Sequence, residues 1–405
     1  MKKKILVLFA ALAIFSTQFV IGISDRPSSP IWAYKAKNEF ITVDMSADGN
    51  YIVAGTDDGY VYLFEKYNPE PLQTYYIYDK VWNLDISADG NYIVAGLYAG
   101  YFFVFERLST SPLWDYWQNQ GGASSLAISA DGNYIAASSS LGKLLLFNRA
   151  NSTPLWESSL YGRTAFSSNG DYLVVGGFDG SIYLLNKSSP IPMWKFNTAG
   201  QVWSVSISAD GEYIAAGGFQ DGRLYLFNKS SSTPMWYFNA YDVVTSVAIS
   251  EDGNYIVAGS QNNNVYLFNR SNPVPLWSYT TNGEIYSVTI SSNGSLIGAW
   301  NFNHQVYLFN SSNSKPIWTF KGSSASYMGE YLQSAAKISS DGRYLSFVSN
   351  KLYLVDRTNL GLIDINSFIT KNLMIFSIES AIAVSVYLGL RYFLIYRQRK
   401  IIRNE

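Results

Sequence analysis

Residues 234–269 read PMWYFNAYDVVTSVAISEDGNYIVAGSQNNNVYLFN, and this stretch decides the fold. It holds four short segments rich in β-branched and aromatic residues, separated by turn-forming residues. Val247 and Ile249 alternate along one segment with the period of two that a β-strand shows. The Asp252-Gly253 pair supplies the positive φ that a tight hairpin needs. The stretch therefore predicts four consecutive antiparallel strands.

The hairpin phrase of this stretch, S-x-D/N-G, occurs eight times along the chain. Its glycines are Gly49, Gly90, Gly132, Gly170, Gly211, Gly253, Gly294 and Gly342. They are 41, 42, 38, 41, 42, 41 and 48 residues apart, so one structural unit is copied along the chain. Such a period, built from short strands that can bury their faces only against neighbouring copies, is typical of a β-propeller. We predict an all-β fold of eight four-stranded blades. Seven blades are the alternative, because Tyr327–Gln333 stretches the last unit.

The two ends of the repeat array are offset by one strand. The first unit begins with an outer strand at Pro30-Ile31-Trp32, whereas the last unit ends with an inner strand at Leu352–Val355. We expect the N-terminal strand to complete the last blade, which leaves no open sheet edge.

Tryptophan recurs at one position of the outer strand. These residues are Trp32, Trp114, Trp156, Trp194, Trp236, Trp277 and Trp318, and the second unit has Gln73 instead. We interpret them as blade-to-blade packing rather than a ring of ligand-stacking indoles, because each buries on the order of 200 Å².

Two motifs in these repeats resemble known propeller families. The order V-x-S-V-x-I-S-x-D-G followed by Y-I-V-A-G resembles the WD-repeat pattern, although Phe-Asn replaces the Trp-Asp ending. The 11-residue span from Leu226 to Trp236 resembles the tryptophan-docking motif of quinoprotein-type eight-bladed propellers with PQQ-like repeats. The resemblance covers residues 30–357 and implies the fold. The calcium-binding acids and vicinal disulfide of quinoprotein dehydrogenases have no counterpart here.

Composition excludes several kinds of chemistry. The 405 residues include no cysteine and one histidine, which excludes disulfides, thiol nucleophiles and histidine-cluster metal sites. We expect no cofactor, no metal and no catalytic residues. Residues 25–371 hold 21 basic and 28 acidic residues, and this acidic balance argues against nucleic-acid binding. The repeated aspartates fit turn chemistry, and His304 fits a solvated polar turn better than a catalytic base.

Both ends of the chain predict membrane targeting. Lys2, Lys3 and Lys4 precede an apolar run, which indicates a signal peptide or an uncleaved signal anchor. Leu373–Leu390 carries one charge and basic residues follow it, so we expect a single-pass helix with a cytoplasmic C-terminus at the cell membrane. The predicted divisions are the signal segment 1–24, an extracytoplasmic propeller 25–357, a linker 358–371, a transmembrane helix 372–396 and a basic tail 397–405.

Chain topology places the candidate binding surface. The chain enters and leaves the propeller on the face that carries the S-x-D/N-G hairpins, which we call the bottom, so the opposite top face should point away from the membrane. Its candidate ligand-binding residues are Trp82, Trp203, Tyr286, Tyr98, Phe178, Phe219, Phe302 and His304. Exposed aromatic side chains with few charges suit protein or glycan partners.

Two further sets of residues carry predictions. The N-x-S/T sequons at the bottom are glycosylation candidates: Asn151, Asn186, Asn228, Asn269, Asn293 and Asn310. Small residues along the predicted membrane helix suit a helix partner or a homodimer: Ser377, Ala381, Ser385 and Gly389.

The sequence thus favours a membrane-anchored, non-catalytic scaffold that binds a protein or a glycan through its membrane-distal face. The alternative is an enzyme, or a subunit of a surface redox or glycan-processing complex. Acidic pairs that converge on the central channel would favour the alternative, and the sequence shows none at positions independent of the repeat.

Overall fold

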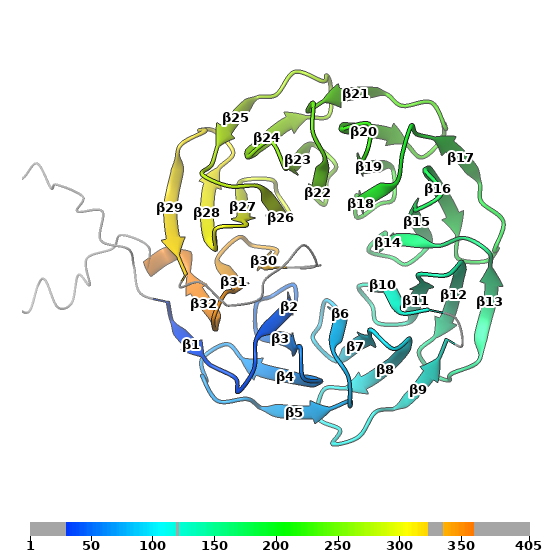
Figure 1. The fold of residues 1–405 in the computed structure, drawn as a ribbon, viewed down its shortest axis with the longest axis vertical. Helices are drawn as coiled ribbons and strands as arrows, with labels where there is room; N and C mark the ends of the chain where they lie inside the picture. Colours follow the sequence, from blue (N-terminus) through cyan, green and yellow to red (C-terminus); the bar gives the residue numbers. More distant parts are fainter. Residues whose placement is uncertain (1–29, 119–120, 323–334, 360–405) are drawn as a thin grey trace, which may run out of the picture. The chain divides into compact units, whose positions relative to one another are not determined.

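Eight four-stranded antiparallel sheets form a closed wheel around a central axis (Figure 1). The structure is a computed structural model that describes residues 30–118, 121–322 and 335–359. Each sheet is one blade. In seven blades the strands run in chain order from the axis to the rim, and in the eighth β1 forms the outer strand. The prediction of eight blades is confirmed, and the alternative of seven is wrong.

The strands are grouped by blade as follows. Blade 1 holds β2 (Phe40–Met45), β3 (Tyr51–Thr56), β4 (Tyr60–Glu65) and β5 (Gln73–Tyr76). Blade 2 holds β6 (Val81–Ile86), β7 (Tyr92–Leu97), β8 (Tyr101–Glu106) and β9 (Trp114–Trp117). Blade 3 holds β10 (Ala123–Ile128), β11 (Tyr134–Ser139), β12 (Lys143–Asn148) and β13 (Pro154–Ser158). Blade 4 holds β14 (Gly162–Phe166), β15 (Tyr172–Gly177), β16 (Ser181–Asn186) and β17 (Trp194–Asn197).

The second half of the wheel repeats this order. Blade 5 holds β18 (Val202–Ile207), β19 (Tyr213–Gly218), β20 (Arg223–Asn228) and β21 (Trp236–Asn239). Blade 6 holds β22 (Val244–Ile249), β23 (Tyr255–Ser260), β24 (Asn264–Asn269) and β25 (Trp277–Thr280). Blade 7 holds β26 (Ile285–Ile290), β27 (Leu296–Asn301), β28 (Gln305–Asn310) and β29 (Pro316–Lys321). Blade 8 holds β30 (Ala336–Ile338), β31 (Tyr344–Val348), β32 (Leu352–Asp356) and β1 (Trp32–Tyr34), and a 3₁₀ helix, η1 (Arg357–Asn359), follows β32.

Strand β1 closes the wheel. It pairs antiparallel with β32, so that Trp32 lies opposite Leu354, and the Ile31 N–H donates to the Leu354 carbonyl at 2.7 Å. The expected N-terminal closure is therefore confirmed. The edge strand that an eight-unit array would otherwise expose is paired.

The outer-strand tryptophans fasten each blade to the next. Trp236 is buried, and its Nε1–H donates to the Arg270 carbonyl of blade 6 at 2.7 Å. In blade 1, where Gln73 replaces tryptophan, the Tyr75 hydroxyl donates to the Arg107 carbonyl at 3.3 Å and restores the contact. The packing interpretation is supported by the Trp236 ring, which lies 5.5 Å from the Phe268 ring of blade 6. Equivalent indole bonds are made by Trp32, Trp114, Trp156, Trp194 and Trp277.

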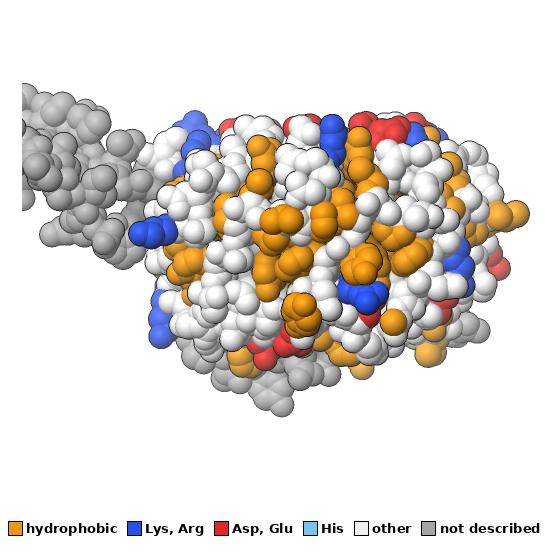
Figure 2. All heavy atoms as spheres, turned by 90° about the horizontal axis from the view of Figure 1, so that it is seen from above, with side chains coloured by type: hydrophobic (Ala, Val, Ile, Leu, Met, Phe, Trp, Pro, Cys, Tyr) orange, Lys and Arg blue, Asp and Glu red, His pale blue; other side chains and the backbone are white. Residues whose placement is uncertain are grey.

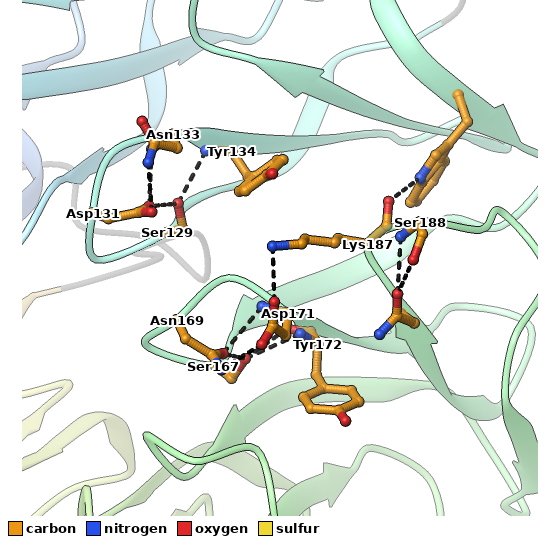
Figure 3. A network of polar contacts seen from close by, with 12 residues as sticks. Ser129, Asp131, Asn133, Tyr134, Ser167, Asn169, Asp171, Tyr172, Lys187 and Ser188 are labelled. Atoms are coloured by element: carbon orange, nitrogen blue, oxygen red, sulfur yellow. Dashed lines mark hydrogen bonds and ion pairs between the residues drawn. The ribbon is translucent and has the colours of Figure 1, made fainter.

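The bottom hairpins have a common internal structure, which Figure 3 shows for blades 3 and 4. The Ser129 hydroxyl donates to Asp131 at 2.6 Å and accepts the Tyr134 N–H at 3.0 Å. These bonds confirm that the aspartate belongs to the turn. Across the seam, the Lys187 Nζ of blade 4 lies 2.8 Å from Asp171 and 4.6 Å from the centre of the Tyr134 ring.

Backbone bonds join the bottom hairpins into a circuit. The residue after each hairpin serine donates its N–H to the equivalent carbonyl of the next blade, from Ala47 to Ala88 at 3.0 Å and finally from Ser340 back to Ala47 at 2.8 Å. Seven of the eight junctions have this bond, and the junction from Ala130 to Ser168 lacks it. The bottom face is therefore tied together around nearly the whole axis.

The flank of the wheel carries half-exposed aliphatic side chains. Figure 2 shows hydrophobic groups along this flank, with charged groups scattered among them and along the two faces. The residue before the outer-strand tryptophan position contributes one such group in seven blades: Leu72, Leu113, Leu155, Met193, Met235, Leu276 and Ile317.

Several predicted segments fall outside the described residues. They are 1–24, the linker beyond residue 359, 372–396 and 397–405, together with the stretch Tyr327–Gln333 and the predicted helix-packing residues Ser377, Ala381, Ser385 and Gly389. Within residues 30–118, 121–322 and 335–359, no helix has the length and apolar character needed to cross a membrane.

Candidate functional site

The innermost strands of the blades line a central channel of about 1060 Å³. Six of these strands have a β-bulge near their top end, for example between Val81 and Asn83 in β6 and between Val202 and Ser204 in β18. A bulge inserts one extra residue and re-aims its side chain. The inserted residues include Trp82 and Trp203, and both line the channel.

Four blades carry an aromatic pair at the top of the channel. Trp203 stacks on Phe219 with ring centres 4.4 Å apart, and Trp82 meets Tyr98 edge-on at 5.5 Å. In blade 7, Tyr286 and Phe302 lie 5.9 Å apart. Each pair joins a residue near the top of the innermost strand to the residue that follows the second strand of the same blade. We call the four pairs the aromatic rim.

The structure therefore brings together seven of the predicted residues. The fourth pair joins Phe178 to Tyr161, 6.0 Å apart, and sequence reasoning missed Tyr161 because it precedes β14 rather than lying in it. Tyr98 and Phe302 are the most exposed members, at 64% and 46%. Phe219 and Phe302 do not line the channel itself but lie against partners that do.

His304 differs from the expected solvated turn residue. It takes the left-handed position (φ 58°) that glycine holds in most top hairpins. Its ring lies 5.8 Å from the buried Trp300 ring, and its Nδ1 is buried with no hydrogen-bond partner among the described residues. Burial lowers the pKa of His304, an effect that Glu39 partly opposes, so the imidazole is neutral at neutral pH. It does not line the channel.

The channel wall carries an acidic pair that sequence reasoning did not expect. Asp44 of β2 and Asp85 of β6 occupy the position two residues before the hairpin serine, and Lys337 of β30 holds the same position in blade 8. Lys337 Nζ lies 3.2 Å from the Asp44 Oδ1. Asp85 lines the channel and Asp44 contacts it from the adjoining blade, and sequence reasoning did not identify this pair.

Burial sets the electrostatics of this cluster. It raises the pKa of Asp85 well above its ordinary value, and the neighbouring Asp44 raises it further while Lys337 opposes the shift. The charge of Asp44 raises the pKa of Lys337, against the effect of burial. The cluster therefore favours an ion pair between Asp44 and Lys337 beside an Asp85 that takes up a proton readily.

The carboxylates also satisfy backbone groups of the next blade. An Asp44 oxygen accepts the Ile86 N–H at 3.2 Å, and an Asp85 oxygen accepts the Ile128 N–H at 2.9 Å. The Ser206 hydroxyl does the same for Ile249 at 3.2 Å. A hydroxyl is thus enough to accept the backbone N–H of the next blade. The negative charge of the two carboxylates is not needed for this structural role.

An alignment of the repeats on the hairpin serine would have revealed the cluster. Two residues before that serine the blades carry, in order, Asp44, Asp85, Ala127, Ala165, Ser206, Ala248, Thr289 and Lys337. The three ionisable residues belong to the consecutive blades 8, 1 and 2.

A further charge lies in blade 4. The Arg163 Nη1 donates to the Ser124 carbonyl at 2.8 Å, and the guanidinium lies 5.6 Å from the Phe178 ring centre. Burial lowers the pKa of Arg163 to about 10, so it stays charged at neutral pH. In the described part of the chain, no three histidine, aspartate or glutamate side chains gather where they could hold a metal ion.

The sequons form Asx turns at the bottom. The Asn228 side-chain oxygen accepts the backbone N–H of Ser230 at 3.0 Å and its hydroxyl at 2.6 Å. Asn186, Asn269 and Asn310 make the same pair of bonds. Glycosylation of these residues stays a prediction.

Comparisons with known proteins agree with this architecture. The structure is similar to the crystal structure of the computationally designed Ika8 protein (13% identity, TM-score 0.69, covering 81% of this chain and 99% of that chain). It is similar to the C-terminal WD40 domain of Sif2 (17% identity, TM-score 0.69, covering 81% and 97%). At these identities the likeness shows the fold alone. No curated protein matches the sequence.

Two family models match the sequence. The model described as "WD domain, G-beta repeat" matches residues 28–65. The model described as "Outer membrane protein assembly factor BamB" matches residues 142–360, which is more than half of the chain. The protein therefore belongs to this PQQ-like repeat family of β-propellers.

Proposed function

We propose that the protein is a non-catalytic scaffold that binds a partner polypeptide at the aromatic rim. The observation that carries the proposal is the set of four aromatic pairs at one end of the channel, of which Tyr98 and Phe302 are largely exposed. Large rigid aromatic side chains dominate the binding energy of protein interfaces. The family description, an assembly factor, supports a role in holding other proteins.

The two faces of the wheel differ in a way that supports this assignment. Backbone bonds around the hairpin circuit tie the bottom, and each of them occupies one hairpin N–H and one hairpin carbonyl. The top has no such circuit among the described residues, and its hairpins present aromatic side chains instead. Loops held on a rigid scaffold are common sites of recognition.

We also propose that the propeller is extracytoplasmic and anchored by its C-terminal segment. The support is in the sequence, where Leu373–Leu390 is apolar and basic residues follow. The first strand of the propeller, β1, begins on the bottom face, and the last strand, β32, ends on the same face. An anchor on that side would leave the aromatic rim facing away from the membrane.

Capture experiments with the full chain test the proposed function. Immobilised wild type, the double variant Trp203→Ala/Phe219→Ala, and Tyr237→Ala would be exposed to the same extract. Tyr237 is half-exposed on the outer strand β21 and serves as the matched aromatic control. We expect a partner that wild type and the control retain and that the double variant loses, and that binds equally after its glycans are removed.

Other outcomes would contradict the proposal. Equal retention by all three proteins would place the binding surface elsewhere. Loss of the partner on removal of its glycans would make the ligand a glycan. Circular dichroism and thermal unfolding of the double variant check that lost capture does not reflect lost folding.

A catalytic role is the second candidate, and the acidic pair is the observation that favours it. Two carboxyl groups in contact at the channel wall, one with a raised pKa, resemble an acid–base pair. Lys337 and the backbone donors at Ile86 and Ile128 already occupy these groups, which favours the binding role. Turnover of a panel of glycosides by wild type, lost in Asp85→Asn, would support catalysis instead.

A further inference from the structure

We infer that the partner places a cationic side chain, a lysine or an arginine, in the channel beside Asp85 and Asp44. This inference rests on the proposed function, because it concerns a side chain of the partner that is bound at the aromatic rim. The evidence is the distribution of charge, one unsatisfied hydroxyl and the comparison between repeats.

Charge is concentrated in one sector of the wheel. At the mouth of blade 1, Asp57 lies near Glu39 and Asp58, and burial together with these neighbours raises the pKa of Asp57. Deeper in the same sector lie Asp44 and Asp85. Among the described residues, Lys80 is the basic residue that lowers the pKa of Asp57 at the mouth, and Lys337 is the one that contacts Asp44 and opposes the raised pKa of Asp85 in the channel. The sector therefore has an excess of negative charge that a cationic group would complement.

A buried hydroxyl in this sector has no partner. Thr42 precedes Asp44 by two residues on β2, so both side chains lie on the same face of the strand. Thr42 lines the channel and is fully buried, and its Oγ1 makes no hydrogen bond to the described residues. At the equivalent position, the Ser204 hydroxyl accepts the Val247 N–H at 2.9 Å. Buried polar groups are seldom left unsatisfied. The unpaired Thr42 hydroxyl therefore indicates that a ligand atom takes the place of the missing hydrogen-bond partner.

The repeats supply an internal comparison. Blades 3, 4 and 6 have alanine where blades 1 and 2 have Asp44 and Asp85, and these blades form the same four-stranded sheets. The fold therefore does not require the carboxylates. Charged groups that are buried beyond the needs of the fold are typical of binding sites.

Trp82 places an aromatic face above the same sector. It lines the channel in blade 2, and the Lys80 Nζ lies 5.3 Å from its ring centre. The rim in this blade thus already holds a cation against an aromatic ring, in the geometry that an entering lysine or arginine would use.

Binding of small probes to the full chain tests the inference without the partner. The probes are N-acetyl-arginine amide and N-acetyl-lysine amide, and N-acetyl-citrulline amide is the neutral control. We expect calorimetric binding of the cationic probes, no binding of the citrulline probe, and binding weakened at least about tenfold in Asp85→Asn. Asp115→Asn, which removes the same charge from the exposed face of β9, should bind as wild type does.

A second variant keeps the test valid if Asp85→Asn folds poorly. Ala127 lies beside Asp85 in the next blade, at the position that Lys337 holds in blade 8. Ala127→Lys would place a permanent ammonium group next to an intact Asp85. We expect it to abolish probe binding, as a tethered competitor does.

The pH dependence provides an independent readout. The groups near Asp85 are Asp44 on β2, Lys337 on β30 and the Ile128 N–H on β10, and Arg163 on β14 lines the same channel. A bound cation favours the ionised carboxyl, so it must lower the raised pKa of Asp85 and release a proton. Probe affinity should therefore fall as the pH falls through the raised pKa of Asp85. Calorimetry in buffers of different ionisation enthalpy measures the proton release.

The outcomes separate the inference from the proposed function. Absence of probe binding, or equal binding of the citrulline probe, would overturn the inference even if the rim variant loses its partner. Probe binding that Asp85→Asn and Ala127→Lys leave unchanged would also overturn it. Partner capture by the aromatic rim is measured in a separate experiment. Loss of the proposed function would therefore appear there, whatever the probes show.

Discussion

Two outer-strand tryptophans differ by a single hydrogen bond. Trp236 and Trp318 are buried to the same extent, but the Trp236 Nε1–H donates to the Arg270 carbonyl at 2.7 Å and the Trp318 Nε1–H has no partner among the described residues. Trp236→Phe should therefore destabilise the fold by about 1 kcal/mol more than Trp318→Phe, because it removes the donor of a partly buried hydrogen bond. Urea unfolding of both variants measures the difference. Equal costs would mean that docking depends on packing alone.

Sequence reasoning at the residue scale succeeded where a residue's role is local. The hairpin aspartates and glycines could be assigned because turn chemistry involves near neighbours; Gly253 has φ +69° and lies against the Tyr213 ring. The roles of Asp44, Asp85 and Lys337 could not, because they depend on contacts between residues 41 to 293 positions apart, across a ring that closes on itself. Their equivalent positions in the repeats were the available signal.

At the scale of the strand, the closure by β1 depends on a few backbone bonds. Ile31→Pro would remove the N–H that donates to the Leu354 carbonyl, whereas Ile31→Ala keeps it. We expect the proline variant to lower the melting temperature and to raise amide exchange first in β30, β31 and β32. Hydrogen-exchange mass spectrometry of the full chain would show this. Unchanged protection of the blade 8 amides from exchange would mean that the wheel closes without the contribution of β1.

Strand content was predictable from the sequence, and local irregularities were not. The repeat gave four strands per unit and the offset of one strand between the two ends, and both hold. The bulges that place Trp82 and Trp203 beside the channel depend on the register with the neighbouring strand, which one strand's residues do not show. Blade 4, where the hairpin spacing falls to 38 residues, has no bulge in β14. The short spacing was the visible sign of that difference.

For the whole molecule, eightfold closure creates sites that no single blade contains. The innermost strand of each blade contributes to the channel wall. The chemistry of the channel therefore depends on which blades carry unusual residues at these positions, and on which of those blades are neighbours. Blades 8, 1 and 2 carry Lys337, Asp44 and Asp85 in succession. Blades 8 and 1 adjoin because the wheel closes, through the pairing of β1 with β32 and through the Ser340 N–H that donates to the Ala47 carbonyl. Periodicity could predict the ring, but the pairing of charges across the closing seam required the structure.

The bottom circuit offers a test of how far that closure governs stability. The hairpin residues Ala209 and Ala130 occupy the same place in a turn whose first carbonyl accepts the glycine N–H, at 2.9 Å in the hairpin of Ala209 and 2.8 Å in that of Ala130. The second position of such a turn accepts proline well. Ala209 donates its N–H to Glu251 in the next blade at 3.0 Å, whereas Ala130 makes no such bond.

Proline at these two positions should therefore act in opposite directions. Ala130→Pro loses no hydrogen bond and restricts the unfolded chain, so it should be neutral or stabilise by up to about 1 kcal/mol. Ala209→Pro restricts the unfolded chain to the same extent, but it removes one bond of the circuit and leaves the Glu251 carbonyl without its donor. It should therefore destabilise the fold by about 1 kcal/mol or more. Denaturant unfolding of the full chain gives both values. If both prolines stabilise, the backbone circuit contributes nothing to closure, and the wheel is held by its tryptophan docking and packed blade faces.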